Sequence, residues 1–282
     1  MSHVAYLEAK RPLDDRSLNR DVLDRFREEL PTEPTVLEVG AGTATMVERL
    51  HEWGIIEDGT WVCVDTHEPA VRAGASRLAA REDATETYDG GVGLGDEVAG
   101  GRDDHAVATL RLDDCRVELN VADAFEFVES TPRSFDAVVG CAFLDIVDPE
   151  PAVAAFGSVA PLLYAPITYD GETTFRPPDA DDAAVLDQYH HHMRECRAGG
   201  PEGATALTKH VEVLSAGPSP WRIDPPYAEG ERRVLAHILD TVETAVEETG
   251  DDASAWAERR RAALDSGDLA YEARNRDLLA RL

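Results

Sequence analysis

The sequence predicts an α/β protein with a doubly wound, mostly parallel sheet, and three observations predict it. Short apolar runs alternate with helix-like segments from residue 35 onward, which is the β-α-β-α order of parallel strands joined by crossover helices. The first apolar run stops at a glycine turn that opens a helix. Three successive runs end in glycine or aspartate, residue types suited to ligand binding at the carboxyl edge of such a sheet.

The elements of the first half follow in order from apolar spacing and from helix stop signals. The apolar residues Leu18, Val22 and Phe26 recur near helical spacing before Pro31. Gly54 is a plausible C-cap for the second helix. The spacing predicts a helix over 15–30, a strand over 35–40, a helix over 43–54, a strand over 60–65 and a helix over 68–81.

The alternation is interrupted once and then resumes. Residues 82–108 are rich in Gly and Asp with few apolar anchors, so we interpret them as a surface insertion. Beyond it we expect strands over 116–124, 134–143 and 161–170, helices around 150–156 and over 179–196, and a closing antiparallel pair over 210–216 and 219–224. This gives a seven-stranded sheet with an antiparallel last strand.

C-terminal helices complete the predicted organisation. Residues 231–248 are amphipathic, and we expect two short helical stretches after them. We therefore divide the chain into an N-terminal helical segment (1–34), a sheet domain (35–228) and a C-terminal helical extension (229–282).

The composition constrains the partners and the environment. Lys and Arg total 27 and Asp and Glu total 56, which gives a net charge of −29 and argues against a nucleic-acid partner. Acids spread along the chain, with Lys10 and Lys209 as the only lysines, are typical of proteins from a halophile. The polar N-terminus and the lack of a long apolar run predict a cytoplasmic protein with no membrane partner. The four cysteines form no CxxC pair, so we predict no metal site.

The strongest local signal is the glycine turn in LEVGAGTAT, which contains Gly40 and Gly42. Glycine lets the backbone turn sharply and approach a ligand closely. Asp65 ends the next strand, where a carboxylate can accept hydrogen bonds from both hydroxyls of a ribose; a turn or N-cap aspartate is the structural alternative. Asp123 ends the third strand, where a carboxylate can accept a hydrogen bond from an adenine amino group.

Together these segments resemble motifs one to four of class I, Rossmann-like methyltransferases that use S-adenosylmethionine (SAM). The matching segments are LEVGAGTA, VCVDTHEP, NVADAFEF and FDAVVGCAFLD, and the resemblance covers roughly residues 35–225. Ala44 replaces the last glycine of the usual GxGxG pattern. Other stretches, such as EAKRP and ARNRDLLA, look similar to a group of bacterial methyltransferases. The resemblance implies cofactor binding by Glu38, Gly40 and Gly42 at the methionine portion, Asp65 at the ribose, Asp123 and Ala124 at the adenine, and Cys141 and Ala142 beside the sulfonium. Thr66, which follows Asp65, is a further candidate for cofactor binding.

Candidates on the acceptor side are weaker. Asp145 follows the fourth strand near the expected acceptor position, although a helix N-cap is the alternative. Tyr169 and His190 are the other candidates for acceptor contact or general-base chemistry. The three consecutive histidines 190–192 point about 100° apart on a helix, so they cannot all face one metal ion.

The segment DPPY (224–227) spells the acceptor-amine motif of DNA and other N-methyltransferases, but we interpret it as a proline turn. The residues before it do not look like a buried central strand, and too little sheet-forming sequence follows it. The net charge would also repel DNA.

The function expected from the sequence is SAM-dependent methyl transfer to a small-molecule acceptor, by O-, N- or C-methylation. One alternative is a non-catalytic SAM-binding protein. The other is a nicotinamide-dependent dehydrogenase on the same fold. Thr45 at the position of the third dinucleotide-fingerprint glycine, and the absence of a YxxxK pair after the fourth strand, count against the dehydrogenase.

Overall fold

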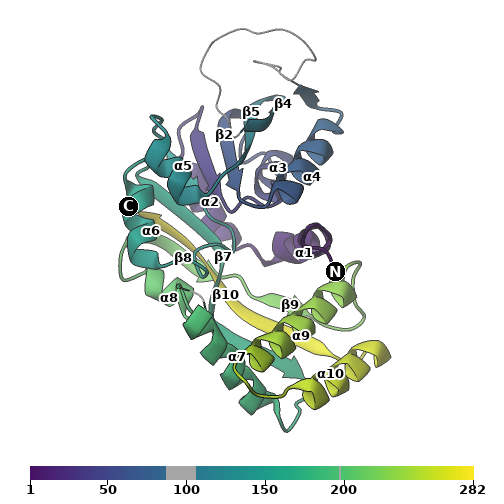
Figure 1. Ribbon diagram of the computed structural model, residues 1–282. Coiled ribbons are helices and arrows are strands. Elements are labelled where there is room, and N and C mark those ends of the chain that lie inside the picture. The colour runs from purple at the N-terminus through teal and green to yellow at the C-terminus, as the bar shows by residue number, and fades with distance from the viewer. Residues whose placement is uncertain (87–105, 197) are drawn as a thin grey trace.

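The computed structural model describes residues 1–86, 106–196 and 198–282, and a mixed sheet forms its centre (Figure 1). The strands are β1 (Thr35–Val39), β2 (Asp58–Asp65), β3 (Ala84–Glu86), β4 (Ala106–Leu112), β5 (Asp114–Val121), β6 (Ala137–Val139), β7 (Leu162–Arg176), β8 (Glu212–Pro218), β9 (Trp221–Ile223) and β10 (Ala270–Arg281). Their spatial order is β3-β4-β5-β2-β1-β6-β7-β10-β8, and β9 pairs with the beginning of β10. The described residues thus contain ten sheet strands, not the seven that we expected.

The middle of the sheet is parallel, as predicted. The run β5-β2-β1-β6-β7 is parallel throughout, and β10 then lies antiparallel between β7 and β8. Side chains of each parallel strand alternate between two cores; for example, Val36 and Leu37 of β1 belong to different ones. Both faces are therefore buried, and the carboxyl ends of the parallel strands meet at one edge.

Helices cover both faces of the sheet. The helices are α1 (His3–Ser17), α2 (Arg20–Glu29), α3 (Thr45–Glu52), α4 (Glu68–Ala79), α5 (Ala124–Ser130), α6 (Pro149–Gly157), α7 (Asp182–Cys196), α8 (Gly203–Leu207), α9 (Glu231–Glu248) and α10 (Ser254–Ser266). Apolar residues of α2, α3 and α4 pack on one face, and those of α5, α6 and α8 pack on the other. The sheet is therefore doubly wound, as the sequence predicts.

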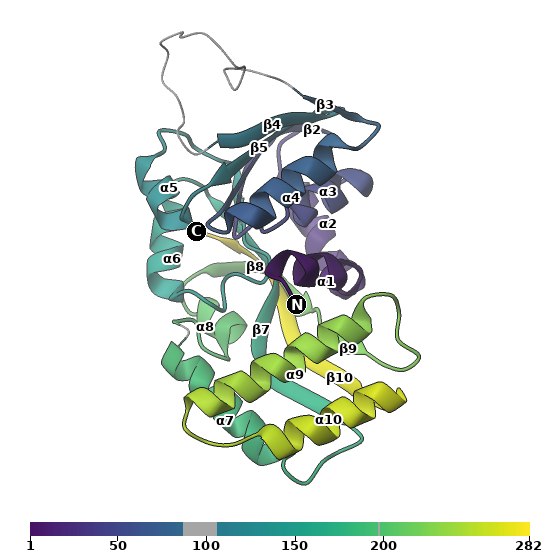
Figure 2. The same cartoon turned by 45° about the vertical axis from the view of Figure 1, so that its right-hand side comes forward.

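A second layer, which we call the cap, is built on the far ends of the two long strands. β7 and β10 run on beyond the parallel core, and α7, α9 and α10 pack on this extension with a separate hydrophobic core. Trp256 and Leu235 are among its fully buried residues. Figure 2 shows α1 lying between the sheet with its helices and the cap. The N-terminal helix therefore contacts both parts of the molecule.

The end of the chain differs from our prediction. The first of the two expected short helices is α10. The second is wrong, because residues 270–281 form β10, which lies between β7 and β8. The segment AYEARNRDLLAR is rich in residues that favour helices. Its pairing with both β7 and β8 overrides that preference. The inward side chains of Asn275 and Asp277 are polar, so the sequence lacks the alternation of apolar and polar residues that would predict a strand.

Three smaller predictions are also corrected. The segments 210–216 and 219–224 do not pair with each other, because β8 and β9 both pair with β10. The helix expected over 15–30 is interrupted after Ser17, and α2 begins after the N-cap Asn19. The ends of the expected insertion 82–108 form β3 and part of β4, which pair antiparallel, while residues 87–105 lie outside the described part of the chain. Among the described helices, none is long and apolar enough to cross a bilayer.

Candidate functional site

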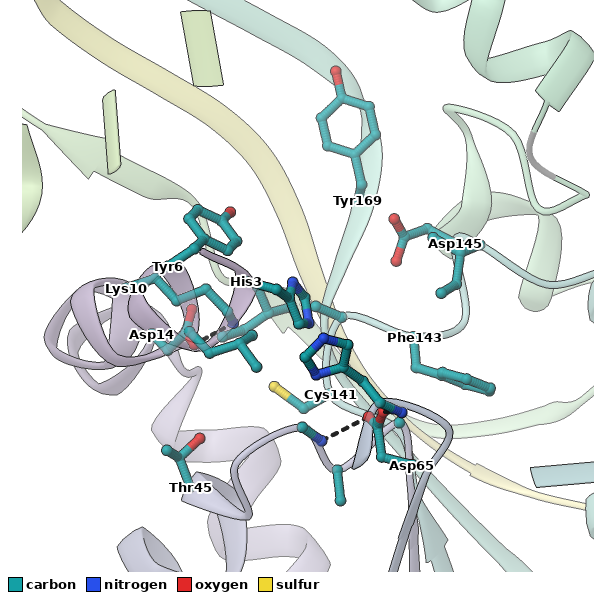
Figure 3. Close-up of a pocket in the computed structure, with 18 of the residues that line it drawn as sticks. His3, Tyr6, Lys10, Asp14, Thr45, Asp65, Cys141, Phe143, Asp145 and Tyr169 are labelled. Atoms are coloured by element: carbon teal, nitrogen blue, oxygen red, sulfur yellow. Dashed lines mark hydrogen bonds and ion pairs between the residues drawn. The ribbon is translucent and has the colours of Figure 1, made fainter. Parts of the chain in front are cut away.

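A pocket of about 720 Å³ lies where the parallel strands end, between the sheet and the cap (Figure 3). Its sheet half is formed by the loops after β1, β2, β5 and β6. Its cap half is formed by α1, β7, α7, α9 and β10 together with the loop that follows Phe143. The residues predicted to bind the cofactor all line this pocket: Glu38, Gly40, Gly42, Asp65, Thr66, Asp123, Ala124, Cys141 and Ala142. Their binding roles stay predictions.

The glycine turn after β1 has the backbone conformation that its sequence suggests. Gly40 and Gly42 have φ values of +62° and +56°, in the left-handed region where glycine carries no Cβ penalty. A Cβ on Gly40 would lie 2.4 Å from Cδ2 of Phe143. Ala44, in place of the last motif glycine, keeps a left-handed conformation at φ +56°. The turn therefore presents bare backbone to the pocket.

Glu38, near the end of β1, is a buried acid whose carboxyl group lies at the floor of the pocket. The Trp61 indole N–H donates to Oε2 of Glu38 at 2.6 Å, and the Cys63 thiol lies 3.7 Å from the same atom. Burial raises the pKa of Glu38 to about 7, and the hydrogen bond from Trp61 opposes that rise. Near neutral pH, Glu38 can therefore gain or lose a proton when a charged group binds beside it.

Asp65, at the end of β2, holds two loops of the site together. Its Oδ2 accepts a hydrogen bond from the Gly42 N–H at 2.8 Å, and its Oδ1 accepts one from the His67 N–H at 2.7 Å. Asp65 therefore has the structural role of a turn aspartate, which was the alternative to ribose binding. A carboxylate has about four lone-pair sites, so two such bonds leave acceptor capacity toward the pocket.

Asp123 and Cys141 follow the next two strand ends. Asp123 is the N-cap of α5, and its Oδ1 accepts from the N–H groups of Phe125 and Glu126. Burial raises the pKa of Cys141 to about 12, so its thiol stays protonated and is no nucleophile. Ala142 has a φ of +51°, and its N–H donates to a β7-side carbonyl, that of Pro166. Such left-handed non-glycine residues concentrate at functional sites.

The three weaker catalytic candidates do not all reach the pocket. Asp145 and Tyr169 line it, whereas His190 does not. His190 lies behind Tyr169, with its Nε2 2.8 Å from the tyrosine hydroxyl, which is also 2.8 Å from Oγ1 of Thr173. Figure 3 shows the Tyr169 ring extending away from Cys141 and toward the cap. Tyr169 therefore lines the part of the pocket that the cap forms.

The contribution of α1 to the pocket was not predicted from the sequence. His3, Tyr6, Lys10 and Asp14 of this helix line the pocket. Lys10 Nζ lies 2.6 Å from Oδ2 of Asp14, one helical turn away. Although burial alone would lower it, the pKa of Lys10 is raised, chiefly because of Asp14. The i, i+4 spacing of these two charges was the one available signal, and it is equally typical of a solvated helix.

A second charge pair, in which only the arginine is buried, adjoins the first. The Arg49 side chain is 1% exposed and lines the pocket from α3. Its Nε donates to Oδ1 of Asp15 at 2.7 Å, and its Nη2 lies 3.9 Å from Asp14. Two cations therefore face two carboxylates beside the pocket, and the contacts of Arg49 with Asp14 and Asp15 join α1 to α3.

The DPPY segment and the histidine run have other roles. None of residues 224–227 lines the pocket; Asp224 pairs with Arg176 at 3.0 Å, and the Tyr227 hydroxyl donates to the Leu269 carbonyl. One of our reasons for rejecting the motif was wrong, because the strand β10 does follow it in the sequence. Its position outside the pocket supports the interpretation as a turn.

The side chains of the histidine run diverge as expected. His190 contacts Tyr169, and His192 contacts Glu248.

One group of side chains outside the pocket has metal-like spacing. In the described part of the chain, His51, Asp83 and Asp113 bring one ligand atom each within 4.8 Å of one another. Arg81 donates two hydrogen bonds to the Asp83 carboxylate, and this contact holds the pKa of Asp83 down to about 2. Because the arginine already balances that charge, we interpret the group as an ion-pair network.

No protein-family model and no curated protein matches the chain. Its backbone is similar to that of YjhP from E. coli, over 99% of this chain and 99% of that one, at 11% identity and a TM-score of 0.48. A SAM-dependent methyltransferase from Thiobacillus denitrificans, solved with S-adenosyl-L-homocysteine, is similar over 93% and 92%, at 12% identity and a TM-score of 0.43. The cyclopropane synthase MmaA2 from Mycobacterium tuberculosis is similar over 92% and 82%, at 11% identity and a TM-score of 0.43.

Proposed function

We propose that this chain is a SAM-dependent methyltransferase that acts on a small-molecule acceptor, by O-, N- or C-methylation. The observation that carries the proposal is the convergence of four strand ends on one pocket. A bare glycine turn follows β1, Asp65 ends β2, Asp123 follows β5, and Cys141 follows β6. Ligands of open α/β sheets bind at this edge.

The residues present fit the proposed cofactor. Gly40 and Gly42 line the pocket in left-handed conformations and carry no Cβ, so a ligand can approach the backbone of this turn closely. The buried acid Glu38 would hold the ammonium group of the methionine part. Asp65 would accept from the ribose hydroxyls, and Asp123 with the N–H of Ala124 would contact the adenine.

When bound, SAM would supply the methyl group as an electrophile. The contribution of the chain is then to align the acceptor and to exclude water. α1 and the cap cover the pocket from the side opposite the strand ends, so both tasks fall to them. With its thiol protonated, Cys141 adds no negative charge beside the reacting centre.

Isothermal calorimetry with SAM, S-adenosylhomocysteine (SAH) and NAD tests the proposal. We expect binding of SAM and SAH but not of NAD. Asp65→Ala should weaken SAM binding by roughly 1.5–3 kcal/mol, the range for hydrogen bonds to a charged group. Because Asp65 also joins two loops, the melting temperature of the variant is measured in parallel.

Asp224→Ala is the matched control, since it removes an exposed aspartate outside the pocket. It should leave SAM affinity unchanged. Equal SAM affinities of the Asp65 variant and the wild type would remove Asp65 from the site, and NAD binding would favour the dehydrogenase alternative. Labelled SAM incubated with an extract of the source cells then separates an enzyme from a non-catalytic SAM-binding protein, and duplex DNA should not be labelled.

A further inference from the structure

We propose that Lys10 of α1, with Arg49 of α3 beside it, forms a subsite for a carboxylate, and that the carboxylate of the cofactor's methionine portion occupies it. This inference rests on the proposed methyltransferase function and adds a binding residue to that site. α1 lies outside the four segments that resemble methyltransferase motifs, so those motifs assign no role to Lys10. Three features carry the inference: the contact of α1 with the glycine turn, a fixed ammonium group, and buried polar atoms that lack hydrogen bonds.

The helix α1 lies directly against the glycine turn. A Cβ on Gly42 would lie 3.0 Å from Cδ1 of Leu7, so this leucine fills the space on one side of the turn. Lys10 follows Leu7 by three positions, which places both residues on the same face of the helix. Both also line the pocket. Lys10 is therefore at the end of the pocket that the glycine turn forms.

The same end of the pocket contains Cys141, which the resemblance places beside the sulfonium. The pKa of the Cys141 thiol is raised to about 12, chiefly by burial and next by Asp14. The charges of Lys10 and Arg49 lower it, and charges shift a pKa in this way only over short distances. Figure 3 shows the ion pair of Lys10 and Asp14 beside the Cys141 side chain. Both cations are therefore close to the part of the cofactor that carries the sulfonium and the amino acid group.

The ammonium group of Lys10 is charged and fixed in position. Its Nζ donates to Oδ2 of Asp14 at 2.6 Å and lies 5.5 Å from the centroid of the Trp221 ring. Although burial alone would lower it, the pKa of Lys10 is raised, chiefly because of Asp14, so the group stays protonated at neutral pH. An ammonium group has three N–H donors, and Asp14 accepts from one of them. The side chain is 12% exposed and lines the pocket, so the other donors can serve a ligand oxygen.

Buried polar atoms beside Lys10 lack hydrogen bonds. Nη2 of Arg49 and Oδ1 of Asp14 are both buried, and neither has a hydrogen-bond partner among the residues that the structure describes. The nearest charged contact of that Nη2 is Oδ2 of Asp14, at 3.9 Å, and the same oxygen accepts from Lys10. Buried polar groups in folded proteins almost always have partners, so an exception indicates a missing ligand, ion or water. A carboxylate bound to Lys10 would give Arg49 a second negative partner.

The ammonium group of an amino acid also has a partner at this end of the pocket. Glu38 is the acid proposed to hold it. Burial raises the pKa of Glu38 to about 7, and Trp61 and then Arg49 oppose that rise, so Glu38 lies close to the guanidinium. An amino acid carries its ammonium and carboxylate groups on one carbon atom. An acid and a cation that lie close together match both groups at once.

The charge balance favours the cofactor over the acceptor as the source of the carboxylate. Lys10 and Arg49 already face Asp14 and Asp15, with contacts of 2.6 and 2.7 Å. The amino acid group of the cofactor is a zwitterion, so it brings a positive charge together with the negative one. A lone carboxylate would bring a negative charge alone, and burying a charge without its counter-charge is costly.

The test compares SAH with decarboxylated SAH, in which a hydrogen atom replaces the carboxylate. Each ligand is titrated calorimetrically into the full chain. We expect the wild type to bind SAH roughly tenfold or more tightly than decarboxylated SAH, because hydrogen bonds to charged groups are among the strong ones. Lys10→Gln keeps an N–H donor for Asp14 and removes the positive charge. It should remove most of this preference by weakening the binding of SAH alone.

Lys209→Gln is the matched control, because Lys209 is the other lysine of the chain, is exposed and does not line the pocket. It should keep the full preference for SAH. A general disturbance of the site would weaken both ligands equally, so the preference reports on the carboxylate itself. If Lys10→Gln does not fold, Lys10→Met combined with Asp14→Leu replaces it, since this pair of substitutions leaves neither charge buried without its partner.

A second arm of the experiment distinguishes the two sources of a carboxylate. Phenylacetate and 2-phenylethanol, which share a ring and a two-carbon arm, are titrated into protein saturated with SAH. Equal binding of SAH and decarboxylated SAH, with a preference for phenylacetate that Lys10→Gln removes, would assign the subsite to the acceptor and overturn its assignment to the cofactor. No carboxylate preference in either arm, or a preference for SAH that Lys10→Gln leaves unchanged, overturns the inference altogether. Failure of SAH and SAM to bind at all would instead overturn the proposed function, so the two failures are distinguishable.

Discussion

The buried acid at the floor of the pocket gives a sharp test, since its charge state should depend on pH near neutrality. Glu38 is 2% exposed, and burial raises its pKa to about 7 from an ordinary value of 4.5. Because the folded-state pKa is above the unfolded one, the folded state binds this proton more tightly. The contribution of Glu38 to stability is therefore fully present below about pH 4.5 and is lost as the pH rises through about 7.

The size of the effect follows from the shift. One pKa unit corresponds to about 1.4 kcal/mol, so the shift of Glu38 amounts to about 3 kcal/mol, most of which falls between pH 5 and pH 8. Glu38→Gln removes the titration and keeps a side-chain oxygen that can accept from the Trp61 indole. Relative to wild type, we expect the variant to gain about 2–3 kcal/mol between pH 5 and pH 8.

Urea unfolding of both proteins at several pH values, in constant high salt, measures this difference. Other carboxylates titrate in both proteins and cancel in the comparison. Asp224→Asn is the control, because it removes an exposed carboxylate that does not line the pocket. A difference between wild type and Glu38→Gln that does not change from pH 5 to pH 8 would refute the assignment of a raised pKa to Glu38.

The same group links proton binding to the proposed cofactor. At pH 7 about half of the Glu38 side chains are protonated. An ammonium group bound beside Glu38 would lower its pKa, so SAH binding should release about half a proton per site. Calorimetry in two buffers of different ionisation enthalpy measures that number, and Glu38→Gln should release none.

Two further predictions concern the glycine turn and the surface charge. Gly40→Ala should lower the free energy of unfolding by about 1–2 kcal/mol, because alanine is strained at the left-handed φ of this position. It should also weaken SAH binding, because the new Cβ displaces Phe143. An unchanged melting temperature together with an unchanged SAH affinity would contradict this prediction. The net charge of −29 should make stability salt-dependent, since the Debye length falls from about 10 Å at 0.1 M to about 3 Å at 1 M. Stepwise KCl should raise the melting temperature, and a sharp transition in dilute buffer that salt does not move would count against both this expectation and a halophilic origin.

The strand ends of the sheet half could be predicted from local sequence. Leu37 and Val39 mark a buried strand, and Gly40 follows directly, so strand and turn are readable in one stretch. Once several such strands are parallel, their carboxyl ends must lie at one edge, and Asp65 and Asp123 are brought together by topology alone. This part of the site depends on few contacts between distant residues.

The contribution of α1 could not be predicted in the same way. Lys10 and Asp14 look like an ordinary surface ion pair in the sequence, yet Asp14 is 1% exposed. Their burial depends on Arg49, which lies 3.9 Å from Asp14 and 35 positions along the chain. A buried ion pair on a helix and a solvated one have the same spacing of opposite charges in the sequence. The periodicity of the sequence therefore does not show which of the two is buried.

The last strand was missed for a related reason, and it bears directly on the pocket. Asp277 of β10 is fully buried. In the sequence, an aspartate at this position argues against a strand that faces a hydrophobic core. Its Oδ1 accepts from the N–H of Ile167, 110 positions away, and its Oδ2 accepts from the N–H of Asn19, 258 positions away, both at 2.8 Å. Ile167 lines the pocket with a φ of +54°, which is strained for a β-branched residue, and Asn19 is the N-cap that separates α1 from α2. One buried carboxylate therefore holds a strained residue of the pocket wall and the junction that positions α1, and both partners are visible only once the chain is folded.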